Sequence, residues 1–415
     1  MLREFLQKAA SVAKRVGVEL SSIIIVLGNE AADADSIISS LCLAYIKQQQ
    51  QVSGNTFYVP VVSIPRSILK LRRETQVLLN LIGLELANLI CLEELDIKKL
   101  SQDSVLQGII LTDHNLIAGS VESKLQNGAS LLVREIIDHH KDAGAYLACK
   151  GLARTIAFDN EHNVATVGSC CTLIAELALT TASTLPALYY ISVLLQGVIC
   201  LDTQNMDIRG VGTLRDAAAL EGLSVHTAGT VDRDRVFAAL RDAKTSPEFW
   251  AELNALECLC IDYKQFTQPG GLEVGISSTL LPVQSFLDKA DAACHIASFM
   301  TRPSLEASME HSDAVQPLDA LIVMSTIYHP LFRRELLIAS YDEARLDAFT
   351  LFFDASGQAV QLEPLVLHKD GTNRMSIQVS KERLLHIQTF HQRNTKASRK
   401  QIAPLVDSFY ASFNS

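Results

Sequence analysis

The residues best suited to chemistry lie in four short polar clusters, each at the end of an apolar run that reads as a strand. The clusters are Asn29, Asp33 and Asp35 in "GNEAADADS", Asp113 in "LTDHN", Asp138, His139 and His140 in "IIDHH", and Asp202 in "VICLDTQN". A single aspartate in such a place is more often a helix cap or a turn residue. Carboxylates from four clusters gathered at one edge of a parallel sheet would instead repel one another and raise their pKa values, unless cations neutralise them. Oxygen ligands combined with imidazoles suit Mg²⁺, Mn²⁺ or a similar ion, so the joint pattern predicts a divalent metal centre.

Alternating strands and helices are expected to position these clusters. Apolar runs occur at residues 22–28, 57–64, 86–92, 108–113 and 131–138, and segments with helical periodicity, such as 36–51 and 68–83, lie between them. Strands that are apolar on both faces and joined by helices indicate a doubly wound parallel α/β sheet. In such sheets ligands bind outside the carboxyl ends of the strands, which is where the clusters fall.

The second half of the chain has a different pattern. The polar, glycine-containing stretch at residues 221–234 separates it from the first half, and we expect strands at 321–327, 346–354 and 375–380 with helices at 283–300 and at the C-terminal end. This mixture predicts a smaller α+β domain. The expected organisation is a metal-binding catalytic domain over residues 1–222, a linker over 223–234 and a substrate-binding domain over 235–415.

Charge and composition narrow the classes of protein. The 415 residues carry a net charge of −10, which argues against a general nucleic-acid binder. Residues 364–415 contain eight Lys or Arg against three acidic residues, so a basic segment follows an acidic body. No apolar run is long enough to span a membrane. The nine cysteines lack zinc-site spacing and are expected to be reduced thiols in the cytoplasm. Residues 1–20 read as a packed amphipathic helix, with a transit peptide as the alternative.

The order of the motifs resembles the DHH phosphoesterase superfamily. Asn-x-x-x-Asp-x-Asp, Asp-His-Asn, Asp-His-His and Leu-Asp-Thr follow one another as they do there. In the second half, "DYKQFTQPGGLEVGIS" and "ASRKQIAPLV" are similar to the two anion-binding motifs of the DHHA2 domain. That pairing occurs in family II inorganic pyrophosphatases, in eukaryotic cytosolic exopolyphosphatases and in prune proteins.

Two positions separate these branches. Family II pyrophosphatases have His where this chain has Asn29, and prune proteins have Asp-His-Arg where it has His139 and His140. The segment "IPRSILKLRRE", residues 64–74, also resembles the exopolyphosphatase and prune branch. The combination is most similar to an exopolyphosphatase, an enzyme that releases orthophosphate from the end of inorganic polyphosphate.

The resemblance implies a role for each site residue. Asp113 is expected to bridge two divalent ions (Mg²⁺ or Mn²⁺, with Co²⁺ as a further option), Asn29 and Asp33 to complete one ion site, and Asp35, His139 and Asp202 the other. A water bridging two such ions loses a proton near neutral pH and can attack phosphorus. The residues expected to hold the phosphates are His140, Lys264, Ser398, Arg399 and Lys400.

Several alternatives stay open at this point. The chain could be a pyrophosphatase or a hydrolase of short polyphosphates or nucleoside tetraphosphates, or, in another class, a prune-like interaction protein. We expect a monomer whose partner is polyphosphate rather than nucleic acid or membrane. Arg66, Arg72 and Arg73 fit a phosphate rim as well as a helix surface, and Ser169 fits a helix cap as well as a substrate contact. Asn115 is expected to support the centre by hydrogen bonds.

Overall fold

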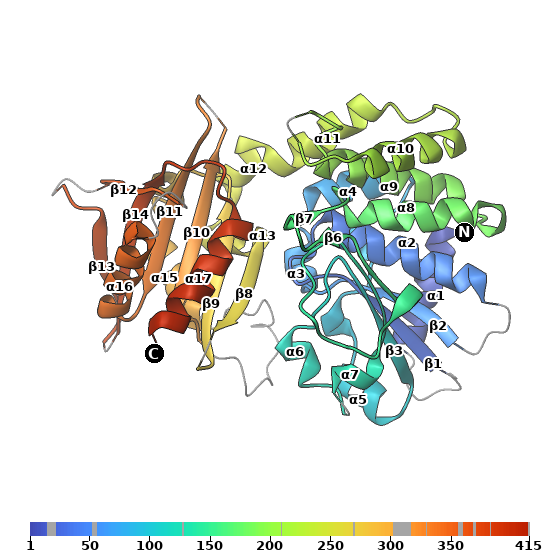
Figure 1. The fold of residues 1–415 in the computed structure, drawn as a ribbon, viewed down its shortest axis with the longest axis horizontal. Coiled ribbons are helices and arrows are strands. Elements are labelled where there is room, and N and C mark those ends of the chain that lie inside the picture. Colours follow the sequence, from blue (N-terminus) through green and yellow to red (C-terminus); the bar gives the residue numbers. More distant parts are fainter. Residues whose placement is uncertain are drawn as a thin grey trace. The chain divides into compact units, whose positions relative to one another are not determined.

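The chain forms two compact units, Met1–Lys244 and Thr245–Ser415 (Figure 1). The computed structural model describes residues 1–413, except 15–21, 52–55, 127, 209, 269, 302–316, 329, 356–359, 368–370 and 382. The expected linker at residues 223–234 contains the last turns of helix α10 (Leu214–His226) and the start of α11 (Arg233–Thr245). Helix α11 belongs to the first unit almost to its end.

A five-stranded parallel sheet forms the centre of the first unit. Its strands are β1 (Ser22–Leu27), β2 (Thr56–Val61), β3 (Leu106–Thr112), β4 (Val133–Asp138) and β5 (Arg154–Ile156). They lie in the order β2-β1-β3-β4-β5, and every neighbouring pair is parallel. The predicted α/β fold with a parallel sheet is therefore confirmed.

Helices cover both faces of this sheet because the strand order reverses after β2. Helix α2 (Ala34–Gln50) connects β1 to β2, whereas α5 (Ile97–Gln102) and α7 (Ala129–Leu132) precede β3 and β4. Right-handed crossovers that run in opposite directions place their helices on opposite faces. On the face of α2 lie α8 (Cys170–Thr180) and α9 (Leu188–Asp202), which contact α2 and each other.

The remaining elements of the first unit are short or peripheral. Helix α1 (Leu2–Lys14) packs on β2 and buries its apolar face, as the amphipathic pattern predicts; the rest of that prediction, residues 15–20, lies outside the described residues. The others are α3 (Arg66–Leu69), α4 (Arg73–Asn80), α6 (Gly119–Glu122), the 3₁₀ turns η1 (Leu86–Asn88), η2 (Leu92–Glu94), η3 (Gly151–Ala153) and η4 (Ala182–Thr184), and the hairpin of β6 (Phe158–Asp159) and β7 (Val164–Ala165).

Two runs of the first unit that read as strands have other structures. Residues 86–92 form the 3₁₀ turns η1 and η2 with a single β-bridge, from Val62 to Cys91. The Arg66 guanidinium binds the carbonyls of Leu86 and Leu89, at 2.9 and 2.6 Å, together with the Glu94 carboxylate. Those carbonyls are therefore unavailable for strand pairing, and Arg66 is a structural residue of this region.

The run before Asp202 is also helical. Residues 188–202 form α9, and Asp202 is its last residue rather than the end of a strand. Every residue from Ile191 to Leu201 is buried, because α2, α8 and α10 surround the helix. A segment that is apolar on all sides has no periodicity to separate helix from strand, so the neighbours decide.

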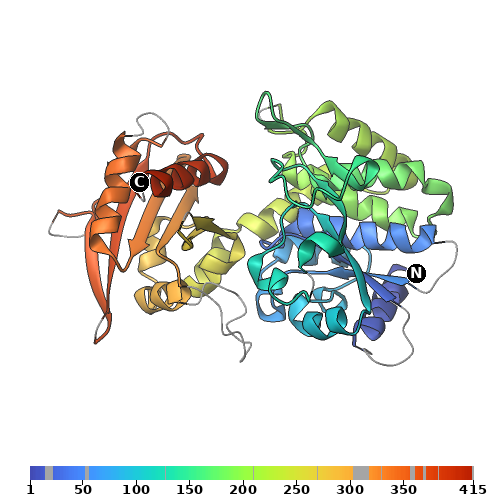
Figure 2. The same ribbon diagram turned by 60° about the horizontal axis from the view of Figure 1, so that its bottom comes forward.

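The second unit is an α+β domain built on a mixed sheet (Figure 2). The strands are β8 (Tyr263–Gln268), β9 (Leu272–Thr279), β10 (Ala320–Ile327), β11 (Arg333–Ser340), β12 (Leu362–Pro364), β13 (Arg374–Ser380) and β14 (Arg383–Gln392). Their order is β12-β14-β11-β10-β9-β8, with β13 also paired to β14; β9 and β10 are parallel and the other pairs antiparallel. The helices are α12 (Pro247–Glu252), α13 (Ala255–Ile261), α14 (Val283–Leu287), α15 (Ala292–Thr301), α16 (Glu343–Ala355) and α17 (Arg399–Phe413).

The strand expected at residues 346–354 is helix α16. Its buried residues Leu346, Phe349 and Phe353 recur at helical spacing and pack with Phe409 and Tyr410 of α17 in the core of the unit. The aromatic residues favour a strand by propensity, but their spacing is that of one helix face. The periodicity was thus the better guide here.

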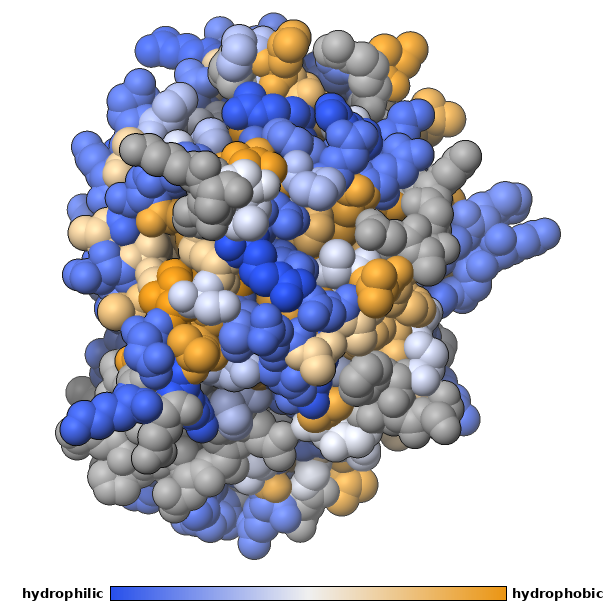
Figure 3. Space-filling view, turned by 90° about the vertical axis from the view of Figure 1, so that its left-hand side faces the viewer, coloured by the Kyte–Doolittle hydropathy of each residue, from blue (hydrophilic) through white to orange (hydrophobic). Residues whose placement is uncertain are grey.

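One face of the chain is mostly polar. On the face seen in Figure 3, hydrophilic side chains predominate and the apolar ones form small separate groups, which is ordinary for a protein surface. Eight of the nine cysteines are buried, Cys294 is exposed, and all nine are free thiols. Among the described residues, no helix is both long and apolar enough to cross a bilayer.

Candidate metal centre

Three of the four polar clusters meet at the carboxyl ends of β1, β3 and β4. In the order β2-β1-β3-β4-β5 the chain leaves β1 and β3 in opposite directions, and in parallel sheets ligands commonly bind beside such a reversal of strand order. The loop with Asn29 follows β1, Asp113 follows β3, and Asp138 ends β4. The fourth cluster supplies Asp202 from the end of α9.

The loop after β1 is a tight turn that leads into α2. Asp33 is the N-cap of α2 and accepts a hydrogen bond from the Ser36 amide at 3.1 Å. This is the helix-cap role that an aspartate at such a position commonly has. The Asn29 backbone amide donates to Ser36 Oγ at 2.6 Å. A Cβ at Gly28 would lie 2.2 Å from Ser36 Oγ, so only glycine allows β1 and α2 to approach this closely.

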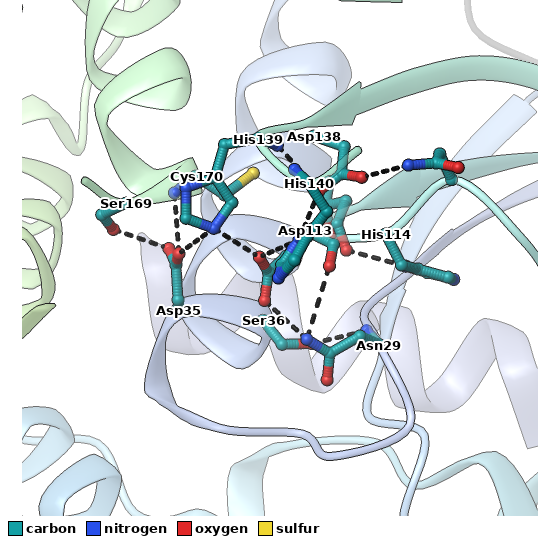
Figure 4. Close-up of polar contacts among 12 residues, drawn as sticks. Asn29, Asp35, Ser36, Asp113, His114, Asp138, His139, His140, Ser169 and Cys170 are labelled. Carbon is teal, nitrogen blue, oxygen red and sulfur yellow. Dashed lines mark hydrogen bonds and ion pairs between the residues drawn. The ribbon is translucent and has the colours of Figure 1, made fainter. Parts of the chain in front are cut away.

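The Asn29 side chain is held at both ends of its amide. Its oxygen accepts from the Ala32 backbone amide at 2.9 Å, and its nitrogen donates to Asp113 Oδ2 at 2.6 Å (Figure 4). Ala32 has φ 46°, a strained value that this turn requires. In this arrangement the amide nitrogen of Asn29, rather than the oxygen expected as a ligand, is directed at Asp113.

A buried arginine fixes the same loop. Arg72 is 2% exposed, and its guanidinium donates to the backbone carbonyls of Ala31 and Ala32. Its neighbour Arg73 is exposed. Of the two alternatives left open for Arg72, a phosphate rim and an ordinary helix surface, the structure supports neither; no signal in the sequence separates the buried arginine from the exposed one.

Asp113 lies at the centre of the cluster and is 2% exposed. Its backbone has φ 62°, which few residues other than Gly, Asn and Asp adopt. His139 Nε2 lies 3.3 Å from Asp113 Oδ1, and His140 Nδ1 lies 3.6 Å from the same oxygen. Even so, no described donor makes a well-oriented hydrogen bond to this buried oxygen.

The two histidines are oriented by different partners. His139 Nδ1 lies 3.2 Å from the Val167 carbonyl, so the ring donates there and turns Nε2 towards Asp113 and Asp35. His140 Nδ1 lies 2.9 Å from Asp138 Oδ1. One ligand atom from each of Asp113, His139 and His140 lies within 4.8 Å of the others, a spacing that a metal ion could bridge.

Asp138 and Asn115 brace the histidine loop. Asp138 is fully buried and accepts hydrogen bonds from the backbone amides of His139 and His140. Asn115 donates to Asp138 Oδ2 at 2.6 Å and to the Lys141 carbonyl at 3.0 Å. Burial opposes ionisation of Asp138, but the bonds to His140 and Asn115 outweigh it and hold its pKa well below the ordinary value.

Asp35 is bound by the N-terminus of α8. Its two oxygens accept from Ser169 Oγ, the Cys170 amide and the Cys171 amide at 2.8, 2.7 and 2.8 Å (Figure 4). The positive end of the helix dipole and these donors stabilise the carboxylate. Ser169 also caps α8, so its hydroxyl serves the helix and Asp35 rather than a substrate. Sequence reasoning missed this contact, because no local signal links residues 35 and 169.

Two other acidic groups of the centre, Asp113 and Asp202, favour protonation. Burial first, and then the charges of Asp35 and its neighbours, raise the pKa of Asp113 and of Asp202 well above the ordinary carboxyl value. Burial works against a charged His139, but the carboxylates of Asp113 and Asp35 raise its pKa to about 10. The raised pKa values of Asp113 and Asp202 thus reflect carboxyl groups that are crowded together and removed from water.

These residues fit divalent cations. Asp113 Oδ1 and Asp202 Oδ2 are buried oxygens without a hydrogen-bond partner in the part of the chain that the structure describes. Buried oxygens of this kind normally have a partner, and an ion would supply it. Carboxylates with imidazole are also the donor set that Mg²⁺ and Mn²⁺ accept.

The expected phosphate-binding residues of the second unit lie on two neighbouring elements. Lys264 is on the edge strand β8, while Ser398, Arg399 and Lys400 lie at the start of α17, which packs against β8. Arg399 donates to the Asp262 carboxylate at 2.7 Å and to its carbonyl at 3.1 Å. Ser398 is bonded to Gln401, and Lys400 is exposed.

Comparison with known families agrees with the motif order. Residues 23–200 match the DHH family N-terminal domain, and residues 239–409 match the DHHA2 domain. The chain thus contains a match to the DHH family N-terminal domain, followed by a match to the DHHA2 domain. The DHH match begins in β1 and ends in α9, and it includes every residue assigned to the centre except Asp202, which lies two residues beyond it.

Similar proteins cover nearly the whole DHH–DHHA2 chain. "Exopolyphosphatase PRUNE1" of Bos taurus is 27% identical over 95% of this chain and 77% of its own length. A "Putative exopolyphosphatase" of Schizosaccharomyces pombe is 28% identical over 92% of this chain and 89% of its own. Among solved structures, a putative family II inorganic pyrophosphatase of Methanococcus jannaschii has a TM-score of 0.53 at 18% identity, covering 94% of this chain and 99% of that one, which supports the fold.

Proposed function

We propose that this DHH–DHHA2 protein is an exopolyphosphatase that hydrolyses the terminal phosphoanhydride bond of inorganic polyphosphate and releases orthophosphate. That the chain is a phosphohydrolase follows from its family and from relatives that bear the name exopolyphosphatase. The observation that carries the proposal is the cluster of Asp113, His139 and His140 at the sheet edge, with buried carboxylate oxygens that lack donors.

In this proposal the centre holds two divalent ions. Asp113 would be shared by both ions, Asp33 and Asn29 would serve one, and Asp35, His139 and Asp202 would serve the other. Asn29 can serve as a ligand only if its amide turns, since its oxygen now accepts from Ala32. When bound, such ions would supply charge neutralisation at the phosphates and would lower the pKa of bound water. Which of Mg²⁺, Mn²⁺ or Co²⁺ is used is left to experiment.

The chain's own residues orient the reacting groups. Asp138 binds His140 Nδ1, so the imidazole presents its other edge, and we assign this edge to the phosphate and to the proton that the leaving phosphate needs. Val167 fixes the ring of His139 through Nδ1. Phosphoanhydride cleavage depends mainly on positioning and charge neutralisation, so a rigid frame of this kind suits it.

The second unit supplies cationic groups for the chain of phosphates. We assign Lys264, Arg399 and Lys400 to phosphate oxygens, with Ser398 as a hydroxyl donor. The Asp262 carboxylate holds the Arg399 guanidinium in a fixed direction, which lowers the entropy lost when it binds an anion. We further propose that the protein acts as a cytoplasmic monomer.

The deciding experiment measures orthophosphate release from pyrophosphate, tripolyphosphate and long polyphosphate, with Mg²⁺, Mn²⁺ and Co²⁺ in turn. We expect faster release from tripolyphosphate and longer chains than from pyrophosphate. A maximum at pyrophosphate would instead identify a pyrophosphatase. If the parent and an Asp113→Asn variant released orthophosphate at equal rates, the centre would take no part in hydrolysis. The remaining alternative would then be a prune-like interaction protein.

A further inference from the structure

One short segment, residues 167–171, contacts two side chains of the metal centre, His139 and Asp35. The Val167 carbonyl accepts from His139, while Ser169 Oγ and the amides of Cys170 and Cys171 bind Asp35. Figure 4 shows Ser169 and Cys170 directed at Asp35, with His139 beside them. The position of this segment therefore sets the positions of His139 and Asp35 together.

A buried aspartate outside the centre anchors this segment. Asp216, on the first turn of α10, has no exposed surface. The Gly168 amide donates to both of its oxygens, at 3.0 and 2.9 Å, and Thr172 Oγ1 donates to Oδ1 at 2.5 Å. The Thr213 amide and hydroxyl donate to Oδ2 at 2.7 and 2.8 Å. The Asp216 carboxylate thus caps α10 and also holds Gly168 and Thr172, which lie just before and within the first turn of α8.

Packing leaves the anchored segment little room to move. A Cβ at Gly168 would lie 2.8 Å from Thr203 Cγ2 and 3.3 Å from Asp216 Oδ2. Thr203 directly follows Asp202, so the segment is enclosed between Asp216 on one side and the end of α9 on the other. A displacement at Gly168 would then reach Asp35, His139 and Asp202.

We propose that Asp216 is a positioning residue for the metal centre, acting through residues 167–171 on His139 and Asp35. The inference rests on the proposed function, since it assigns these two side chains to a divalent ion. Asp216 itself binds Gly168, Thr172 and Thr213, and we assign it to neither an ion nor the substrate. Side chains that orient metal ligands in this way typically change affinity about 10- to 100-fold when they are replaced.

The test is Asp216→Asn in the full-length chain, with Mn²⁺ binding measured by calorimetry in the absence of polyphosphate. The asparagine side chain has the size of the aspartate side chain. However, it directs an NH₂ group at some of the hydrogen-bond donors of Gly168, Thr172 and Thr213, which bind a carboxylate oxygen in the parent protein. We expect the dissociation constant for Mn²⁺ to rise about tenfold. The Mn²⁺ concentration that half-activates orthophosphate release should rise in parallel, while the rate at saturating Mn²⁺ recovers to near that of the parent.

Two further variants make the test specific. Arg215→Gln breaks the exposed ion pair with Glu176, which joins the same helices α10 and α8, and should leave Mn²⁺ affinity within about twofold of the parent. Thr172→Val removes one donor to Asp216 and spares the α10 cap, and should weaken Mn²⁺ binding about fivefold, the equivalent of one hydrogen bond of ~1 kcal/mol.

The outcomes separate this inference from the proposed function. If the parent binds no divalent ion, the metal centre itself is wrong. If the parent binds Mn²⁺ and the folded Asp216→Asn protein binds it equally well, only the positioning role is overturned. Should Asp216→Asn fail to fold, Thr172→Val decides, and unchanged affinity in that variant contradicts the role. A rate that saturating Mn²⁺ does not restore also contradicts it.

Discussion

Asp113 combines a left-handed backbone, full burial and a side-chain oxygen without a described hydrogen-bond donor. Each feature costs free energy in a chain without ions, and such costs concentrate at functional sites. The two oxygens differ in environment, since Asn29 binds Oδ2 and the histidines lie beside Oδ1. A shared ligand between two ions needs this kind of access from two sides.

We predict that Asp113→Asn abolishes divalent binding and lowers orthophosphate release at least 100-fold, because the central charge is lost. Asparagine tolerates φ 62°, whereas alanine would add about 1 kcal/mol of backbone strain, so Asn is the cleaner substitution. Thermal melting in EDTA should show a variant at least as stable as the parent, since a buried carboxyl with a raised pKa has been removed. A large loss of stability in EDTA would contradict this account.

Asn29 offers a second test at the residue scale. Replacing its amide by imidazole in Asn29→His adds a nitrogen ligand, which favours transition metals over Mg²⁺. We predict a rise in the ratio of Mn²⁺- to Mg²⁺-supported rates, measured by titrating each ion at fixed tripolyphosphate. Asn29→Ala is the matched control, because it removes the amide without adding a ligand. An unchanged ratio in Asn29→His would show that this position does not touch an ion.

At the scale of elements, the centre is held by a turn and a helix terminus rather than by the strands alone. The start of α8 binds Asp35, and the buried guanidinium of Arg72 binds the turn at Ala31 and Ala32. Both contacts provide hydrogen-bond donors to backbone carbonyls or a carboxylate that would otherwise be buried without partners. The strands supply the edge, and these two contacts determine where the side chains point.

We predict that Arg72→Met lowers the free energy of unfolding by about 2–3 kcal/mol, because two buried carbonyls lose a charged donor. It should also weaken Mn²⁺ binding, since the turn carries Asn29 and leads to Asp33. Denaturant unfolding and calorimetry measure the two effects. Arg73→Met, at the exposed neighbour, is the control and should change the stability by less than about 0.5 kcal/mol. Equal effects at both positions would be inconsistent with the contacts described.

At the scale of the whole molecule, ionisation of the centre couples stability to pH. In metal-free protein the pKa values of Asp113 and Asp202 are raised, so the folded chain keeps protons that the unfolded chain releases above about pH 4. The pKa of His139 is raised to about 10, so its stabilising contribution is complete below about pH 6.5 and is lost as the pH rises towards 10. The raised pKa values of Asp113, Asp202 and His139 all make the metal-free folded chain less stable as the pH rises.

We therefore predict that the melting temperature of metal-free protein falls between about pH 6.5 and pH 9, the range over which the His139 contribution is lost.

Saturating Mg²⁺ or Mn²⁺ should raise the melting temperature by mass action, and the gain should grow with pH because binding releases protons. Scanning calorimetry with EDTA or with metal measures both. Asp113→Asn, which is expected not to bind the ions, should show no metal-induced gain at any pH. A metal-induced gain that shrinks with pH would contradict the assignment.

Much of the fold and of the centre could be predicted because it depends on local patterns. The apolar runs of β1, β3 and β4 and the polar residues that end them place Asn29, Asp113 and His139 at one edge of a parallel sheet. The errors fall where local patterns are ambiguous. Residues 198–201 are apolar on all sides, so only the surrounding helices make them helical, and Asp202 arrives from a helix end.

The amino-acid sequence by itself determined which residues could bind metal and phosphate, the α/β class of the first unit and the family. The tertiary structure decided what holds them. The bonds from α8 to Asp35, from Arg72 to the turn and from Asp216 to Gly168 join residues 135, 40 and 48 positions apart. Periodicity and spacing describe neighbours within one element, so contacts between distant elements appear only when the chain is folded.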